Sequence, residues 1–98
     1  MTLDDKYEDI IKSHENVIVD FFAEWCGPCT EVFAKIEQEL KKGKNVKVVK
    51  VDMDDHADIG EDLELPGIPY VILYQNGEKK KEFYGRDWPK LKEIMDSV

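Results

Sequence analysis

Cysteine is scarce in this sequence, because its 98 residues contain only two. Two cysteines cannot build the disulfide framework of a small secreted protein, and by themselves they cannot supply the four ligands of a structural zinc site. They are Cys26 and Cys29, three positions apart in the chain. That spacing makes the pair the first candidate for a functional site.

Long apolar runs and an excess of basic charge are also missing. The longest apolar run, Tyr70 to Tyr74, has five residues, and the first nine residues lack the basic and apolar blocks of a signal peptide. We therefore expect an unexported, cytoplasmic chain with no membrane partner. Lys and Arg total 14 against 22 Asp and Glu, and the resulting formal charge of −8 repels phosphate backbones. We expect no nucleic-acid partner.

The sequence does contain enough apolar residues, 42%, for one domain covering residues 1–98. Apolar periodicity alternates between helical and strand patterns along the chain. Helices are predicted over 4–14, 29–42 and 54–65 and after Asp87, and strands over 17–23, 46–51, 70–75 and 78–84. An Asn-Gly turn at 76–77 predicts that the last two strands form an antiparallel hairpin. The fold class is therefore α/β, with a βαβ half followed by a ββα half.

The cysteines lie between the buried strand 17–23 and the following helix, so we expect Cys26 to be exposed at the helix N-terminus and Cys29 one turn inside. Free N–H groups and the positive end of the helix dipole stabilise a thiolate and lower its pKa. Cys26 is then the nucleophile that attacks a disulfide, and Cys29 attacks the resulting mixed disulfide and releases the reduced substrate.

A metal half-site or an inert local disulfide is the alternative reading of the pair. Only His14 and His56 could complete a zinc shell with the two thiols. His14 falls on the predicted core-facing stripe of the first helix, together with Tyr7, Ile10 and Ile11, and His56 belongs to an acidic run. We interpret both as ordinary packed or solvated histidines and expect no metal.

Asp20 is anomalous because it is a carboxylic acid inside the apolar run from Val17 to Ala23. Burying an unpaired carboxylate is costly, so its pKa should rise toward neutrality. A group that titrates there can act as a general acid and base beside a thiol. The alternative is a strand end at which Asp20 is exposed.

The segment from Val19 to Cys29, VDFFAEWCGPC, resembles the active-site segment of thioredoxins. Gly67-Ile68-Pro69 resembles the second signature of that family, a loop with a cis-proline that faces the cysteines. Asn76-Gly77-Glu78 and Gly85 fall where thioredoxins have their hairpin turn and a following glycine. The resemblance covers nearly the whole chain and implies a thioredoxin-like fold.

The resemblance also implies the roles of the site residues. Cys26 would be the nucleophile, Cys29 the resolving thiol, and Asp20 the buried acid that moves a proton to or from Cys29 through water. Lys50 stands where thioredoxins keep a lysine, and two orientations are open for it: inward to pair with Asp20, or solvated at the sheet edge.

The substrate surface is implied in the same way. Trp25, Gly27 and Pro28 would surround the cysteines, with Trp25 as a contact residue or, alternatively, partly buried in the core. Pro69 would be the cis-proline, or else a simple turn residue, and the backbone of Ile68 would pair with an extended substrate peptide. The implied partners are disulfide-containing proteins and a thioredoxin-reductase-like electron donor. We expect a monomer with no cofactor beyond the cysteine pair.

The sequence departs from the family pattern at its start, where only Met1 to Leu3 precede the predicted first helix and the usual first strand is missing. The predicted sheet therefore has four strands in the order 46–51, 17–23, 70–75, 78–84, with helices on both faces. Tyr70 places a large ring next to Pro69. Seven acids and no Lys or Arg lie between Asp52 and Glu64, either as a solvated face or as a steering surface for basic partners.

Three functions compete on these observations. The first is a dithiol oxidoreductase that reduces protein disulfides and is recharged by a partner reductase. The second is a redox-independent binding module that uses the surface around Trp25 and Pro69. The third is a metal or cluster protein bridged across a dimer by Cys26 and Cys29.

Overall fold

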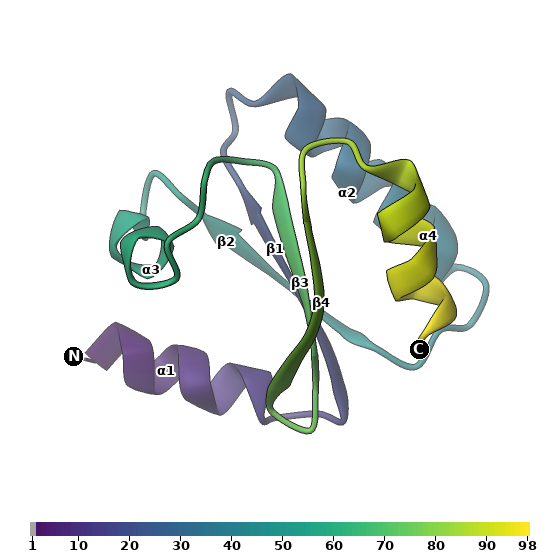
Figure 1. Ribbon diagram of the computed structural model, residues 1–98, viewed down its shortest axis with the longest axis horizontal. Coiled ribbons are helices and arrows are strands. Elements are labelled where there is room, and N and C mark those ends of the chain that lie inside the picture. Colours follow the sequence, from purple (N-terminus) through teal and green to yellow (C-terminus); the bar gives the residue numbers. More distant parts are fainter. Residues whose placement is uncertain (1) are drawn as a thin grey trace.

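The computed structural model describes residues 2–98, and side chains from residue 6 onward. These residues form four helices and four strands, which alternate along the chain up to the third strand and end with the third strand, the fourth strand and the last helix (Figure 1). They are α1 (Thr2–Ile11), β1 (Asn16–Phe22), α2 (Gly27–Leu40), β2 (Lys47–Asp52), α3 (Ala57–Asp62), β3 (Tyr70–Gln75), β4 (Glu78–Tyr84) and α4 (Trp88–Asp96). In the described chain no strand precedes α1.

One mixed sheet forms the centre of the fold, with strand order β2-β1-β3-β4. β1 and β2 are parallel, whereas β1 with β3 and β3 with β4 are antiparallel. Asn76 (φ 55°) and Gly77 (φ 82°) make the hairpin turn, the positive φ angles that an Asn-Gly turn needs. The predicted fold class and strand order are confirmed.

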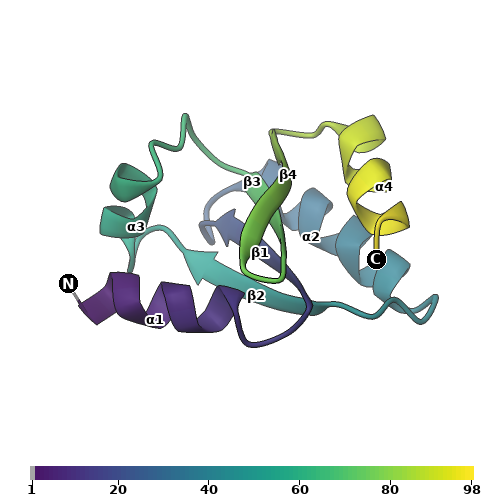
Figure 2. The ribbon, with the colours of Figure 1, turned by 60° about the horizontal axis from the view of Figure 1, so that its bottom comes forward.

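The two faces of the sheet carry separate apolar clusters because side chains alternate along each strand. In β1, Val17, Val19 and Phe21 point toward α1 and α3, and Ile18 points toward α2 and α4. Figures 1 and 2 show the helices divided in this way, with α1 and α3 on one side of the sheet and α2 and α4 on the other.

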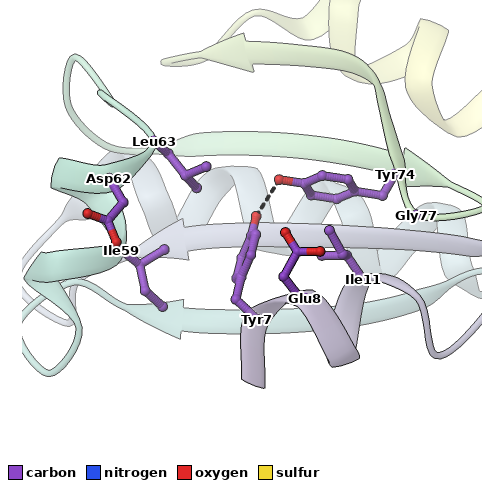
Figure 3. A pocket seen from close by; sticks show the side chains of 8 residues that line it. All are labelled: Tyr7, Glu8, Ile11, Ile59, Asp62, Leu63, Tyr74 and Gly77. Atoms are coloured by element: carbon purple, nitrogen blue, oxygen red, sulfur yellow. Dashed lines mark hydrogen bonds between the residues drawn. The ribbon is translucent and has the colours of Figure 1, made fainter. Parts of the chain in front are cut away.

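A hydrogen bond between two buried phenols ties α1 to the sheet. The hydroxyl of Tyr7 lies 2.6 Å from that of Tyr74 in β3, and the two rings meet edge to face (Figure 3). They line a cavity of about 490 Å³ between α1 and α3. Burial and this contact raise the pKa of Tyr7 far above its ordinary value.

Three predicted helices differ from the observed ones in length. α1 ends at Ile11, and the Ser13 hydroxyl then donates to the Ile10 carbonyl at 2.6 Å, so His14 lies beyond the helix and is exposed, as is Ile10. α2 begins at Gly27 because Cys26 is its N-cap. α3 was predicted over 54–65 but covers only Ala57–Asp62, because the Asp52 carbonyl accepts from Asp55 and His56 in a turn.

Candidate active site

Cys26 and Cys29 form a disulfide at the N-terminus of α2. Their Cα atoms are 5.3 Å apart, and the Cys26 sulfur accepts a hydrogen bond from the Cys29 N–H at 3.2 Å. Pro28 lies in the first turn of the helix, where a missing N–H costs nothing. The sulfur of Cys26 therefore occupies the position at which the N–H groups of a 14-residue helix stabilise negative charge.

Cys26 is not exposed, contrary to the prediction. Its exposed fraction is 6% and that of Cys29 is 2%, because Ala23, Phe22 and Ile68 pack around the disulfide. The sequence pattern placed Cys26 correctly at the helix end, but a loop from another part of the chain covers it. Gly27 and Pro28, between the two cysteines in the chain, are exposed.

The covering loop contains the Ile68–Pro69 peptide bond, which is cis. Phe21 at the end of β1 is the register partner of Tyr70 at the start of β3, so the two connecting loops leave the sheet at the same end (Figure 1). The Pro69 carbonyl accepts from the Gly85 N–H at 2.8 Å. The backbone N–H and C=O of Ile68 have no hydrogen-bond partner among the described residues.

Trp25 is the most exposed large apolar side chain of the site, with 72% of its surface accessible. Its indole N–H donates to the carboxylate of Asp54, 3.0 Å from Oδ2. The bond fixes the ring on the outside of the molecule. The exposed fraction of 72% excludes the alternative of a Trp25 partly buried in the core. Asp54 was not predicted as a site residue, since nothing in the chain pattern links positions 29 residues apart.

Asp20 is completely buried in β1, and neither of its carboxylate oxygens has a hydrogen-bond partner among the described protein atoms. Loss of hydration raises the pKa of Asp20 to about 6, against a smaller lowering by the positive charge of Lys50. The alternative of an exposed strand end is thereby excluded.

Lys50 is exposed on the edge strand β2, which agrees with the solvated orientation at the sheet edge and not with an inward pair to Asp20. Its ammonium lies 3.8 Å from the ring centre of Phe33 in α2 and 4.3 Å from that of Phe22. It makes no ion pair with Asp20, although the two residues are register partners. Lys50 and Phe33 line a cavity of about 290 Å³ that also reaches Cys29 and Thr30. Phe33 is a second residue that the sequence reasoning missed.

Among the described residues, no group of three or more His, Cys, Asp or Glu side chains is placed to hold a metal ion. Among the same residues, no helix has both the length and the apolar composition that crossing a bilayer requires.

Comparison with known proteins places this site in a family. The family model described as Thioredoxin matches residues 1–97. Thioredoxin-2 of Pyricularia oryzae is 37% identical over 91 residues, which are 93% of this chain and 53% of that protein. Thioredoxin of Mycoplasma genitalium is 37% identical over 78 residues, 80% of this chain and 76% of that protein.

A solved structure agrees with these relatives. The solution structure of oxidised thioredoxin from Plasmodium falciparum superposes with a TM-score of 0.80 at 32% identity, covering 95% of this chain and 89% of that one. The sequence matches, the fold and the disulfide at the N-terminus of α2 all support the same family assignment. The chain belongs to the thioredoxin family, and its Cys26–Cys29 pair makes it a thiol–disulfide oxidoreductase.

Proposed function

We propose that this protein reduces disulfides of other proteins with Cys26 as the attacking thiol and Cys29 as the resolving thiol. The observation that carries the proposal is the position of the Cys26 sulfur at the N-cap of α2, where it accepts the N–H of Cys29. In the reduced protein the same N–H groups stabilise the Cys26 thiolate, which is the reactive form.

The reaction is a pair of exchanges that conserves electrons. The Cys26 thiolate attacks one sulfur of a substrate disulfide, which forms a mixed disulfide and releases the other substrate sulfur as a thiolate. Cys29 then loses its proton and attacks the Cys26 sulfur. The Cys26–Cys29 disulfide forms, the substrate leaves with two reduced thiols, and the protein has given up two electrons.

Asp20 is proposed to take the proton from Cys29. Asp20 is a buried acid whose pKa is about 6. A group with a pKa near neutral pH can accept a proton from the thiol and return it in the reverse reaction. The proton would travel through water, with the cavity beside Cys29, Phe33 and Lys50 as its connection to solvent. Lys50 tunes the acid from a distance, since its charge lowers the pKa of Asp20.

Substrate contact is proposed for Trp25, Gly27, Pro28, Ile68 and Pro69. Trp25 offers a rigid exposed ring beside the disulfide. The unpaired backbone groups of Ile68 can bond to an extended substrate chain, as in the addition of a strand to a sheet. Gly27 and Pro28 are exposed and small or rigid, so they allow close approach to Cys26.

We infer that residues 1–98 act as one monomeric domain, that the cysteine pair needs no added cofactor, and that a thioredoxin-reductase-like protein returns the two electrons. We place the protein in the cytoplasm, because a disulfide reductant works where thiols are kept reduced. A mitochondrial thioredoxin of Mus musculus is also 37% identical over 83 residues, so imaging of the tagged full-length protein is the test of location.

The test of the function is reduction of insulin disulfides with dithiothreitol as the electron source. Wild-type protein should accelerate the reaction, and the Cys26→Ser and Cys26→Ser/Cys29→Ser variants should run at the rate of dithiothreitol alone. A wild-type rate no higher than that of Cys26→Ser would contradict the proposal. A redox titration of the pair then separates a reductant from an oxidant or isomerase.

A further inference from the structure

We propose that a cavity beside the disulfide selects substrates that carry a lysine or arginine next to the attacked cysteine. The cavity, here called the α3 cavity, lies between Trp25, the segment 53–65 and Ile68. The inference rests on the proposed attack by Cys26, and it adds a substrate class to that reaction.

The α3 cavity adjoins the reacting sulfurs. Its volume is about 450 Å³, and its wall includes Trp25, the neighbour of Cys26 in the chain, and Ile68, which packs against the apolar cluster that contains the two cysteines. A substrate chain that pairs with the Ile68 backbone and presents its cysteine to Cys26 therefore passes the mouth of this cavity. A residue adjacent to that cysteine can place its side chain inside.

The base of the α3 cavity is apolar. Met53, Gly60 and Leu65 line it, and Gly60 stands inside α3, where glycine is a poor helix former. A side chain at position 60 would run into the terminal methyl group of Met53. Glycine thus allows Met53 to lie across the helix, and the aliphatic stem of a lysine or arginine finds an apolar surface there.

The rim of the α3 cavity is acidic. Asp54, Glu61 and Glu64 line it, and Asp54 is already bonded to Trp25. Eight ion pairs join other acids of the surface to Lys or Arg, but no described cation lies within ion-pair distance of any acid between Asp52 and Glu64. Glu61 and Glu64 are exposed and unengaged by described side chains, and they complement a cationic side-chain tip.

A substrate with Asp or Glu next to the attacked cysteine would be disfavoured by the α3 cavity. Its carboxylate would lie against carboxylates with no local cation to offset them, which slows association. Because the whole chain carries a net charge of −8, some preference for basic peptides is expected from any part of its surface. The experiment must therefore separate the α3 cavity from net charge.

The experiment measures second-order rate constants for reduction of matched peptide disulfides by the prereduced full chain. Three peptides of one length differ only in the residues beside the cysteine, which are Lys, Gln or Glu. Wild type is compared with Glu61→Gln/Glu64→Gln and with Glu15→Gln/Glu37→Gln. The latter pair removes two exposed acids outside the α3 cavity, so both variants have the same net charge.

We expect wild type to reduce the Lys peptide roughly tenfold faster than the Glu peptide at low ionic strength, where screening is weak. In Glu61→Gln/Glu64→Gln the ratio should fall to about threefold or less, and in Glu15→Gln/Glu37→Gln it should stay near the wild-type value. Charge reversal by Glu61→Lys/Glu64→Lys should favour the Glu peptide.

Equal ratios in wild type and both Gln variants would overturn the selection by the α3 cavity, while rapid reduction of the Gln peptide would leave the oxidoreductase function intact. If no peptide is reduced faster by wild type than by Cys26→Ser, the proposed function itself fails. The Gln peptide thus distinguishes the two failures.

Discussion

Asp20 and Lys50 are register partners on neighbouring parallel strands, yet their charged groups do not pair. The ammonium of Lys50 lies on the faces of Phe33 and Phe22, where the π electrons attract a cation. The carboxyl of Asp20 is left without a partner in the sheet, and burial dominates its pKa. A completed ion pair would have kept Asp20 ionised and unable to exchange a proton with Cys29 near neutral pH.

Replacing Lys50 should raise the pKa of Asp20 further above its value of about 6, because the charge of Lys50 is the influence that lowers it. Carbon-13 NMR titration of the Asp20 carboxyl in Lys50→Met measures the change. Lys47→Met is the control, since Lys47 lies on the same strand but alternation directs it to the other face. An unchanged Asp20 pKa in Lys50→Met would show that the two charges do not interact.

Asp20 should make stability fall as pH rises. Its pKa is raised in the folded state, from 3.8 to about 6, so its contribution is fully present below pH ~4 and is lost as pH rises through ~6. A shift of this size corresponds to about 3 kcal/mol of unfolding free energy. Relative to Asp20→Asn, the wild type should lose that amount between these pH values.

Denaturant unfolding of both oxidised proteins across this pH range measures the difference. The buried amide of Asp20→Asn adds a cost that does not vary with pH, so the slope and not the absolute value is compared. Parallel stability curves for the two proteins would contradict a raised pKa at this position.

Cys29→Ser should accumulate the intermediate that Cys26 forms. Without the second thiol nothing intramolecular attacks the mixed disulfide, so turnover in the insulin assay should drop to the background rate while the adduct persists. Mass spectrometry of the intact protein under non-reducing conditions detects the adduct. Cys26→Ser should carry no adduct. Adducts of equal yield on both variants would contradict the assignment of Cys26 as the attacking thiol and Cys29 as the resolving thiol.

The phenol pair between α1 and the sheet should show coupling. Tyr7→Phe leaves the buried hydroxyl of Tyr74 without its partner, which should cost about 1 to 2 kcal/mol of unfolding free energy. Tyr7→Phe/Tyr74→Phe removes both hydroxyls and should cost less than the sum of the two single changes. Thermal and denaturant unfolding of the two single variants and the double variant completes a double-mutant cycle. If the free-energy change of the double variant equals the sum of the single changes, the hydrogen bond contributes nothing to stability.

Much of the site followed from residues that are close in sequence. Cys26, Pro28 and Cys29 are neighbours, so the helix start and the cysteine pairing depend on short-range geometry. The apolar run around Asp20 predicted that the acid would be buried, because apolar residues facing both sides of a sheet indicate a strand covered on both faces. The structure shows Asp20 fully buried.

Other features were decided only when distant segments met. Cys26 is covered because Ile68 packs against its cluster, and the Trp25 indole is hydrogen-bonded to Asp54. The ammonium of Lys50 lies over the ring of Phe33 and does not pair with Asp20. Each contact joins segments that are far apart in the sequence, so no sequence periodicity or motif spacing predicts it. Which partner a side chain contacts depends on the groups that the folded chain brings near it.

The sequence by itself thus determined the chemistry of this protein: two thiols at a helix end, a buried acid, a proline loop and the order of four strands. Local backbone preferences and the alternation of apolar residues along the chain are sufficient to predict these features. The tertiary structure alone decided how accessible Cys26 is, where the Lys50 charge lies, and that an acid-rimmed cavity adjoins the disulfide. Accessibility and charge placement depend on which surfaces pack together, and that is a property of the whole fold.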